Sequence, residues 1–178
     1  MTVHTVVKIG GALMAEPALY ARVTDALGHV PRDGRMLIVP GGGPFADTVR
    51  EVDRRLVIGD DAAHWAAILA MDQYAHVLAA RIAGAALVDG PGPWPADRLP
   101  VLAPYRWLRA ADALPHSWDV TADSIAAWVA RALGARRLVL LKLDAGTDPY
   151  LSQAAQGLDV RIVRADLASA LFDDMLDQ

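Results

Sequence analysis

Two lysines, the only two in the chain, stand where chemistry on phosphate groups would need them. Lys8 lies near the end of an apolar run and is followed by Gly10 and Gly11, and Lys142 follows the apolar run 138–141. A lysine ammonium is a compact charge and a common phosphate ligand, whereas arginine carries a planar fork. These positions therefore indicate phosphate chemistry. Taken without the neighbouring glycines, the two lysines would be explained equally well by a codon bias toward arginine that left two lysines by chance.

Two glycine loops follow apolar runs. Gly10 and Gly11 allow a sharp turn that presents backbone N–H groups to an anion, although a plain turn is the alternative. The loop 41–43, which is Gly41, Gly42 and Gly43, leads into a predicted helix whose free amides and dipole favour an anion. Neither loop fits GxxxxGK[ST] or GxGxxG, so a conventional P-loop and a dinucleotide fingerprint are excluded.

Polar residues elsewhere are candidates for the same site. Thr121 is a predicted N-cap with Asp123 in the first turn, so Asp123 either stabilises that helix or orients the lysine ammoniums. Asp144 follows Lys142 in a turn that suits either a nucleotide-phosphate site or an exposed salt bridge. Asp72 stands in an otherwise apolar stretch and is either a buried partner or a substrate ligand.

The sequence predicts no metal site built from protein side chains. His64 and Asp72 are eight residues apart, which is not the tight ligand spacing of a zinc site. Asp144 and Asp148 are the only candidates for direct magnesium ligands. The alternative is a magnesium ion held chiefly by nucleotide phosphates and water.

Strand and helix patterns alternate along the chain. The expected strands are 2–9, 35–39, 85–88, 137–141 and 160–163, and the expected helices are 16–27, 44–56, 60–82, 105–113, 125–133, 149–156 and 166–176. The segment 90–104 holds five prolines and two glycines and is expected to be a loop. This alternation predicts an α/β fold with a parallel sheet covered on both faces. Ligands of such sheets bind beyond the carboxyl ends of the strands, where both lysines lie.

Composition limits the partners. A net charge of −4 argues against nucleic acid, and no apolar stretch is long enough to cross a membrane. The N-terminus lacks the pattern of a signal peptide, and the absence of cysteine fits a cytoplasmic protein. We expect one domain that binds a small-molecule substrate. Its high apolar content, 54%, favours a homo-oligomer.

Four motifs together resemble the amino acid kinase superfamily, which includes acetylglutamate, aspartate, uridylate and isopentenyl phosphate kinases. They are the segments 7–11, 39–43, 120–123 and 141–144, in this order over most of the chain. The resemblance implies a three-layer αβα sandwich with a mainly parallel central sheet, and in-line transfer of the γ-phosphoryl group of ATP with Mg²⁺.

Two further stretches, 67–74 and 118–125, resemble a narrower branch of this family. That branch acts in methanofuran-type one-carbon cofactor biosynthesis and phosphorylates aminomethylfuran-methyl phosphate to a diphosphate. The resemblance also implies roles for single residues. These are Lys8 at the transferring group, Asp123 holding the lysine side chain, Gly10, Gly11 and Lys142 at the nucleotide, and Gly41 to Gly43 at the acceptor. To these we add Asp144 as a nucleotide-binding residue, and Asp72 and Thr121 as substrate-binding residues.

The resemblance divides the single domain 1–178 into an acceptor half, about 1–115, and a shortened nucleotide half, about 116–178. The segment 143–146 replaces the Asp-Val-Asp-Gly turn of several relatives, and no lysine follows Lys142. Three alternatives stay open. They are a kinase of the same fold with a carboxylate, carbamate or other phosphate acceptor, a non-catalytic ligand-binding or assembly relative, and a regulatory subunit of a larger enzyme.

Overall fold

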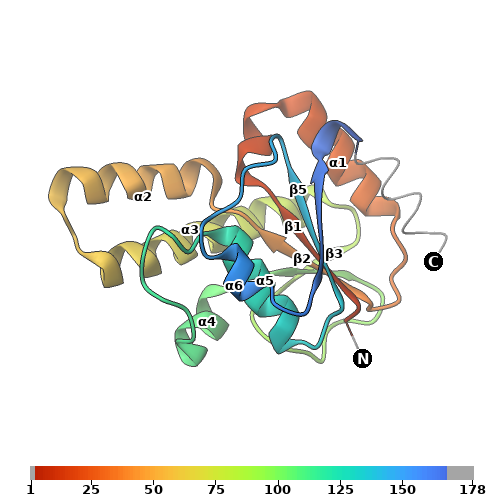
Figure 1. Ribbon diagram of the computed structural model, residues 1–178. Helices are drawn as coiled ribbons and strands as arrows, with labels where there is room; N and C mark the ends of the chain where they lie inside the picture. The colour runs from red at the N-terminus through yellow and green to blue at the C-terminus, as the bar shows by residue number, and fades with distance from the viewer. Residues whose placement is uncertain (1–2, 168–178) are drawn as a thin grey trace.

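A sheet of six strands forms the centre of the molecule, and every neighbouring pair in the order β3-β4-β2-β1-β5-β6 is parallel (Figure 1). The computed structural model describes residues 3–167. The strands are β1 Thr5–Ile9, β2 Met36–Pro40, β3 Ala85–Val88, β4 Leu99–Leu102, β5 Arg137–Lys142 and β6 Asp159–Arg164. The α-helices are α1 Pro17–His29, α2 Gly43–Leu56, α3 Asp60–Arg81, α4 Tyr105–Ala111, α5 Ala122–Ala132 and α6 Leu151–Ala154. Two 3₁₀ helices, η1 Gly11–Ala15 and η2 Ala165–Leu167, complete the described elements.

Helices cover both faces of this sheet. Val6 of β1 belongs to one core together with Ile125 of α5, and the next residue, Val7, belongs to a second core together with Val23 of α1. Successive strand residues point to opposite faces, so a continuous apolar run is what a sheet buried on both sides requires. The α/β class and the mainly parallel three-layer αβα arrangement are therefore confirmed.

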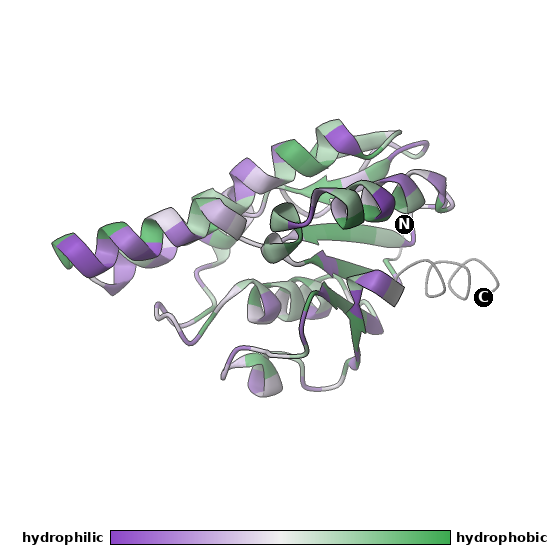
Figure 2. Ribbon diagram, turned by 90° about the horizontal axis from the view of Figure 1, so that it is seen from above, coloured by the Kyte–Doolittle hydropathy of each residue, from purple (hydrophilic) through white to green (hydrophobic). Residues whose placement is uncertain are grey.

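Helix α2 and the first part of α3 form a helical hairpin that extends away from the sheet (Figures 1 and 2). The glycine loop at the end of β2 starts α2, with Pro44 in its first turn, where the missing amide hydrogen costs no helical bond. The chain reverses at Val57 and Gly59, both of which have positive φ angles. Farther along α3, Tyr74 and Leu78 enter the core. The hairpin therefore forms a wall beyond the carboxyl end of β2.

The main error of the sequence analysis is β4, which lies inside the proline-rich segment expected to be a loop. Pro100 stands in the middle of β4, between β3 and β2, where proline is unusual because it cannot donate a ladder hydrogen bond. The pairing of β2 with β4 joins only Ile38 and Val101, so the proline disturbs little of the ladder between these strands. Of the expected helix 166–176, the structure describes only the start, within η2. The remainder lies outside the described residues.

The first strand begins at Thr5 rather than at residue 2, and α6 is shorter than the expected helix 149–156. Within residues 3–167, no helix combines the length and the hydropathy needed to span a bilayer.

Candidate active site

The parallel sheet brings the two lysines to one edge. Strands β1 and β5 are direct neighbours, with Ile9 beside Leu141, so Lys8 and Lys142 both lie at the carboxyl ends of adjacent strands. The first turn of α5 faces the same edge and carries Asp123. Residues separated by more than a hundred positions in the chain therefore converge, as ligand sites of open α/β sheets do.

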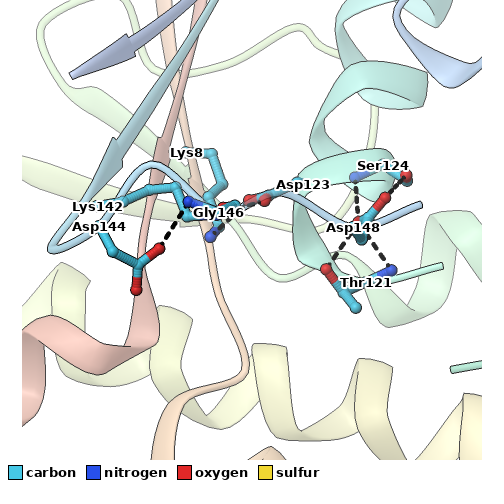
Figure 3. Close-up of polar contacts among 8 residues, drawn as sticks. All are labelled: Lys8, Thr121, Asp123, Ser124, Lys142, Asp144, Gly146 and Asp148. Atoms are coloured by element: carbon cyan, nitrogen blue, oxygen red, sulfur yellow. Dashed lines mark hydrogen bonds and ion pairs between the residues drawn. The ribbon is translucent and has the colours of Figure 1, made fainter. Parts of the chain in front are cut away.

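Asp123 bridges the two ammonium groups (Figure 3). Its Oδ1 atom lies 2.8 Å from Lys8 Nζ, and its Oδ2 atom accepts a hydrogen bond of 2.7 Å from Lys142 Nζ. The side chains of Lys8 and Asp123 are only 7% and 3% exposed, so the ion pair is shielded from water. The three groups together carry one net positive charge, which suits an anionic ligand.

The protonation states follow from burial and from these contacts. Burial lowers the pKa of Lys8 below its ordinary value, although the Asp123 carboxylate opposes this shift. Burial would raise the pKa of Asp123, but the ammoniums of Lys8 and Lys142 outweigh it and hold that pKa below its ordinary value. The carboxylate is therefore ionised at neutral pH and serves as a charge partner rather than as a proton carrier.

Asp148 holds the start of α5 in place, and the sequence analysis did not assign it this role. Its Oδ2 atom accepts hydrogen bonds from the backbone N–H groups of Thr121 and Ser124, at 3.0 and 3.1 Å, and from the Thr121 hydroxyl at 2.7 Å (Figure 3). Its Oδ1 atom accepts from the Ser124 hydroxyl. Asp148 thus caps α5 from a separate loop and fixes the turn that carries Asp123. No local spacing signals this contact, because the partners are more than twenty positions apart.

The two glycine loops touch each other. A methyl group on Gly11 would lie 2.1 Å from the Gly43 nitrogen and 2.2 Å from its Cα atom, so only glycine fits there. Gly10 donates its amide hydrogen to Leu141 and Gly41 donates to Ile9, both at 2.8 Å. These two glycines therefore join the loops to the sheet through their amides. Gly43 begins α2, where amides have no acceptor within the helix.

A cavity of about 420 Å³ opens next to this cluster. Lys8, the glycine loops and Thr121 lie at one end, and one face of α3 runs along it with Ile68 and Met71. The segment 117–122 and part of α2 complete the lining. The cavity combines an apolar wall with a cationic, amide-rich end, as small-molecule sites commonly do.

Trp118 joins α2 to the segment 117–122 beside the cavity. Its indole Nε1–H donates to Asp53 at 2.9 Å, and the Arg50 guanidinium lies 4.9 Å from the centre of its ring. Arg50 also pairs with Asp47 of the preceding turn at 2.9 Å. These contacts tie the helical hairpin to the segment before α5.

His64 also lines the cavity and stacks on His116, with ring centres 4.2 Å apart. His116 contacts the carboxylates of Asp61 and Asp112, and these hydrogen bonds raise the pKa of His116. Burial, reinforced by the charge of His116, lowers the pKa of His64 to about 4. The His64 imidazole is therefore neutral near pH 7.

Three of the predicted site residues, Asp72, Asp144 and Lys142, do not line the cavity. Asp72 does not line the cavity, and its Oδ1 atom accepts a hydrogen bond of 3.0 Å from the Tyr105 amide at the start of α4. Asp144 is exposed and accepts from the Gly146 amide at 2.8 Å, which closes its own turn. Lys142 contacts Asp123 and the Gly146 carbonyl but does not line the cavity. Residues 3–167 contain no cluster of three or more His, Asp or Glu side chains arranged to hold a metal ion.

Comparisons with known proteins agree with this architecture. The family model described as "Amino acid kinase family" matches residues 4–92. The chain is 32% identical over 140 residues to the [5-(aminomethyl)furan-3-yl]methyl phosphate kinase of Methanocaldococcus jannaschii, and the match covers 76% of this chain and 63% of that protein. A uridylate kinase structure from Archaeoglobus fulgidus matches with a TM-score of 0.58 and 19% identity, over 81% of this chain and 65% of the other. The chain thus spans less than two thirds of the length of either relative.

Proposed function

Because the chain belongs to the amino acid kinase family, we propose that it is a kinase that transfers the γ-phosphoryl group of MgATP to a small, phosphate-bearing acceptor. Aminomethylfuran-methyl phosphate is the proposed acceptor, since it is the substrate named for the curated relative. The product would then be the corresponding diphosphate.

The observation that carries the proposal is the bridge from Lys8 through Asp123 to Lys142 beside two glycine loops. In phosphoryl transfer, negative charge spreads over the oxygens of the transferring group, so catalysis depends on positioning and charge neutralisation. Lys8 lines the cavity and would bind the transferring group, whereas Lys142 lies outside the cavity and would face the nucleotide. Asp123 would hold both ammoniums at these positions.

The acceptor itself explains why no general base is needed. A phosphate monoester is largely ionised near pH 7, because its second pKa is about 6, so its oxygen can attack without giving up a proton first. The amides of Gly10 and Gly41 are bound to strand carbonyls. The phosphate would therefore be bound by the Lys8 ammonium and by the N–H groups of Gly11, Gly42 and Gly43, which line the cavity. The apolar wall formed by Ile68 and Met71 suits a ring.

The described residues fit a magnesium ion held by the phosphates of the nucleotide better than one held by protein side chains. The Lys8–Asp123–Lys142 cluster is cationic, and residues 3–167 offer no carboxylate cluster to a cation. When bound, Mg²⁺ would add positive charge at the donor phosphates, held there by phosphate oxygens and water. The contribution of the chain remains the two ammoniums and the loop amides.

The direct test is incubation of the protein with MgATP and aminomethylfuran-methyl phosphate, with ADP and the diphosphate product followed by mass spectrometry. Lys8→Ala should lower turnover by at least about a hundredfold, because it removes the charge at the transferring group. Asp25→Asn, on α1 and 81% exposed, is the control and should keep turnover within about twofold.

Three results would change the proposal. Full activity of a folded Lys8→Ala protein would refute the assigned role. ATP binding by calorimetry without product would keep the kinase and reject this acceptor, in favour of another phosphate, a carboxylate or a carbamate. Neither product nor ATP binding would favour a non-catalytic relative.

A further inference from the structure

Charge is distributed unevenly along the cavity. Its inner end, near Lys8 and Gly43, is cationic and rich in amides. Its outer end, defined here by Asp47, Arg50, Asp60 and His64, lies along the helical hairpin. Within the outer end, Asp47 and Arg50 neutralise each other in an ion pair of 2.9 Å. Asp60 has no cationic partner among residues 3–167, so the outer end is anionic.

A single face of α3 forms this gradient. The residues of α3 that line the cavity are Asp60, Ala63, His64, Ala67, Ile68 and Met71, a spacing of three or four that defines one face of a helix. Along that face the two polar side chains come first and the large apolar ones last. From Asp60 to Met71 the helix rises roughly 16 Å, at about 1.5 Å per residue.

His64 is a buried polar group turned toward the cavity. Its residue is 7% exposed, and within the described part of the chain neither ring nitrogen has a hydrogen-bond partner. A neutral imidazole offers one nitrogen as an acceptor. Behind it, His116 stacks on the His64 ring at 4.2 Å between centres and contacts the carboxylates of Asp61 and Asp112.

From this geometry we infer that the outer end of the cavity binds an ammonium group of the acceptor through Asp60 and His64, and that these two residues select an amine-bearing acceptor. The inference rests on the proposed function. His64 lies one helical turn from Asp60 and one turn from Ile68, roughly 6 Å each along α3, so one acceptor can place its ammonium beside the first two residues and its ring against the third. An acceptor with a phosphate on one side of a small ring and an aminomethyl group on the other is roughly 8 Å long, at about 1.5 Å per bond.

The test compares two acceptors that differ only in the amine, namely aminomethylfuran-methyl phosphate and the analogue in which a methyl group replaces the aminomethyl group. The wild-type protein should have a kcat/KM at least about tenfold higher for the amine, because a site built for a polar group rejects an analogue that lacks it. Asp60→Asn and His64→Leu should each lower kcat/KM for the amine by about tenfold. They should act mainly through KM, since the amine lies far from the transferring phosphoryl group.

The same two variants should leave kcat/KM for the methyl analogue within about twofold of the wild-type value. A general loss of structure would instead lower turnover of both acceptors. Asp25→Asn, on α1 and 81% exposed, is the control and should change neither value. Asp60 is exposed, so Asp60→Asn carries the test even if His64→Leu fails to fold.

Equal turnover of both acceptors by the wild-type protein would overturn the inference and leave the kinase proposal intact. An equal loss for both acceptors in Asp60→Asn would also overturn it. If the wild-type protein turns over neither acceptor while binding ATP, the proposed acceptor is wrong and the inference is refuted with it.

Discussion

Replacing Asp123 by asparagine should destabilise the protein by about 3–5 kcal/mol, because it leaves a buried ammonium without a counter-charge. Lys8 bears most of this cost, since its side chain is 7% exposed and Asp123 is its ion-pair partner at 2.8 Å. Lys142 is less affected, because it keeps a hydrogen bond to the Gly146 carbonyl. A charge held between two ammoniums is therefore a structural requirement as well as a proposed catalytic one.

Urea denaturation measures this loss. With a slope of about 2 kcal/mol per molar urea, the midpoint of Asp123→Asn should fall by roughly 1.5–2.5 M. The deficit should shrink as pH rises from 7 toward 9.5. Burial lowers the pKa of Lys8 in the folded protein and the Asp123 carboxylate opposes this shift, so in Asp123→Asn that pKa falls further. The unfolded chain then binds more protons than the folded variant, and the variant gains more stability with rising pH than the wild-type protein does.

A second substitution shows whether Asp123→Asn destabilises the protein through the loss of the ion pair or through poor packing of the asparagine. In Lys8→Met/Asp123→Asn the most deeply buried ammonium is gone and only Lys142, whose side chain is 14% exposed, lacks its counter-charge. The double variant should therefore recover more than about 1 kcal/mol relative to Asp123→Asn. Asp144→Asn should stay within about 0.5 kcal/mol of wild type. The reasoning fails if Asp123→Asn costs less than about 1 kcal/mol, or if the double variant is less stable than the single one.

Three further predictions follow from other parts of the site. Asp148→Asn should cost about 2 kcal/mol in urea denaturation and lower turnover, because the charged cap of α5 at Thr121 and Ser124 is weakened. Gly11→Ala should cost at least about 3 kcal/mol in the same measurement, because its methyl group would lie 2.1 Å from backbone of the facing loop. The pKa of His64 is about 4 in the folded protein and 6.5 ordinarily, so the unfolded chain takes up the proton first. Stability should fall by about 1.4 kcal/mol per unit as pH drops through this range, and His64→Gln should abolish that slope.

Each of these three substitutions has a control variant at an exposed or unhindered position. Asp119→Asn, an exposed acid before the same helix, should be neutral, and an equal loss there would contradict the role of Asp148. Gly157→Ala meets no atom within 4 Å and should cost only about 1 kcal/mol, for its φ of +84°. If Gly11→Ala loses no more stability than Gly157→Ala, the close approach of the two loops does not make a side chain at residue 11 unfavourable. His29→Gln, at a side chain 78% exposed, should keep the wild-type slope with pH.

The sequence by itself determined the α/β class, most of the helices and strands, and the pairing of lysines with glycine loops at strand ends. These features are local, since apolar periodicity, glycine, proline and charge all act within a few residues. For the same reason the sequence predicted a loop where β4 lies, because Pro100 is a residue rarely found in a strand inside a sheet.

Only the tertiary structure decided which polar residues meet. Asp72 and Asp123 look alike in sequence, as single acids near apolar runs, yet Asp72 binds the Tyr105 amide outside the cavity and Asp123 bridges both lysines. The contacts of Asp148 with Ser124 and of His64 with His116 likewise form only when the chain folds. Such contacts join segments far apart in the chain, and their energy depends on burial and distance, which no local pattern of residues specifies.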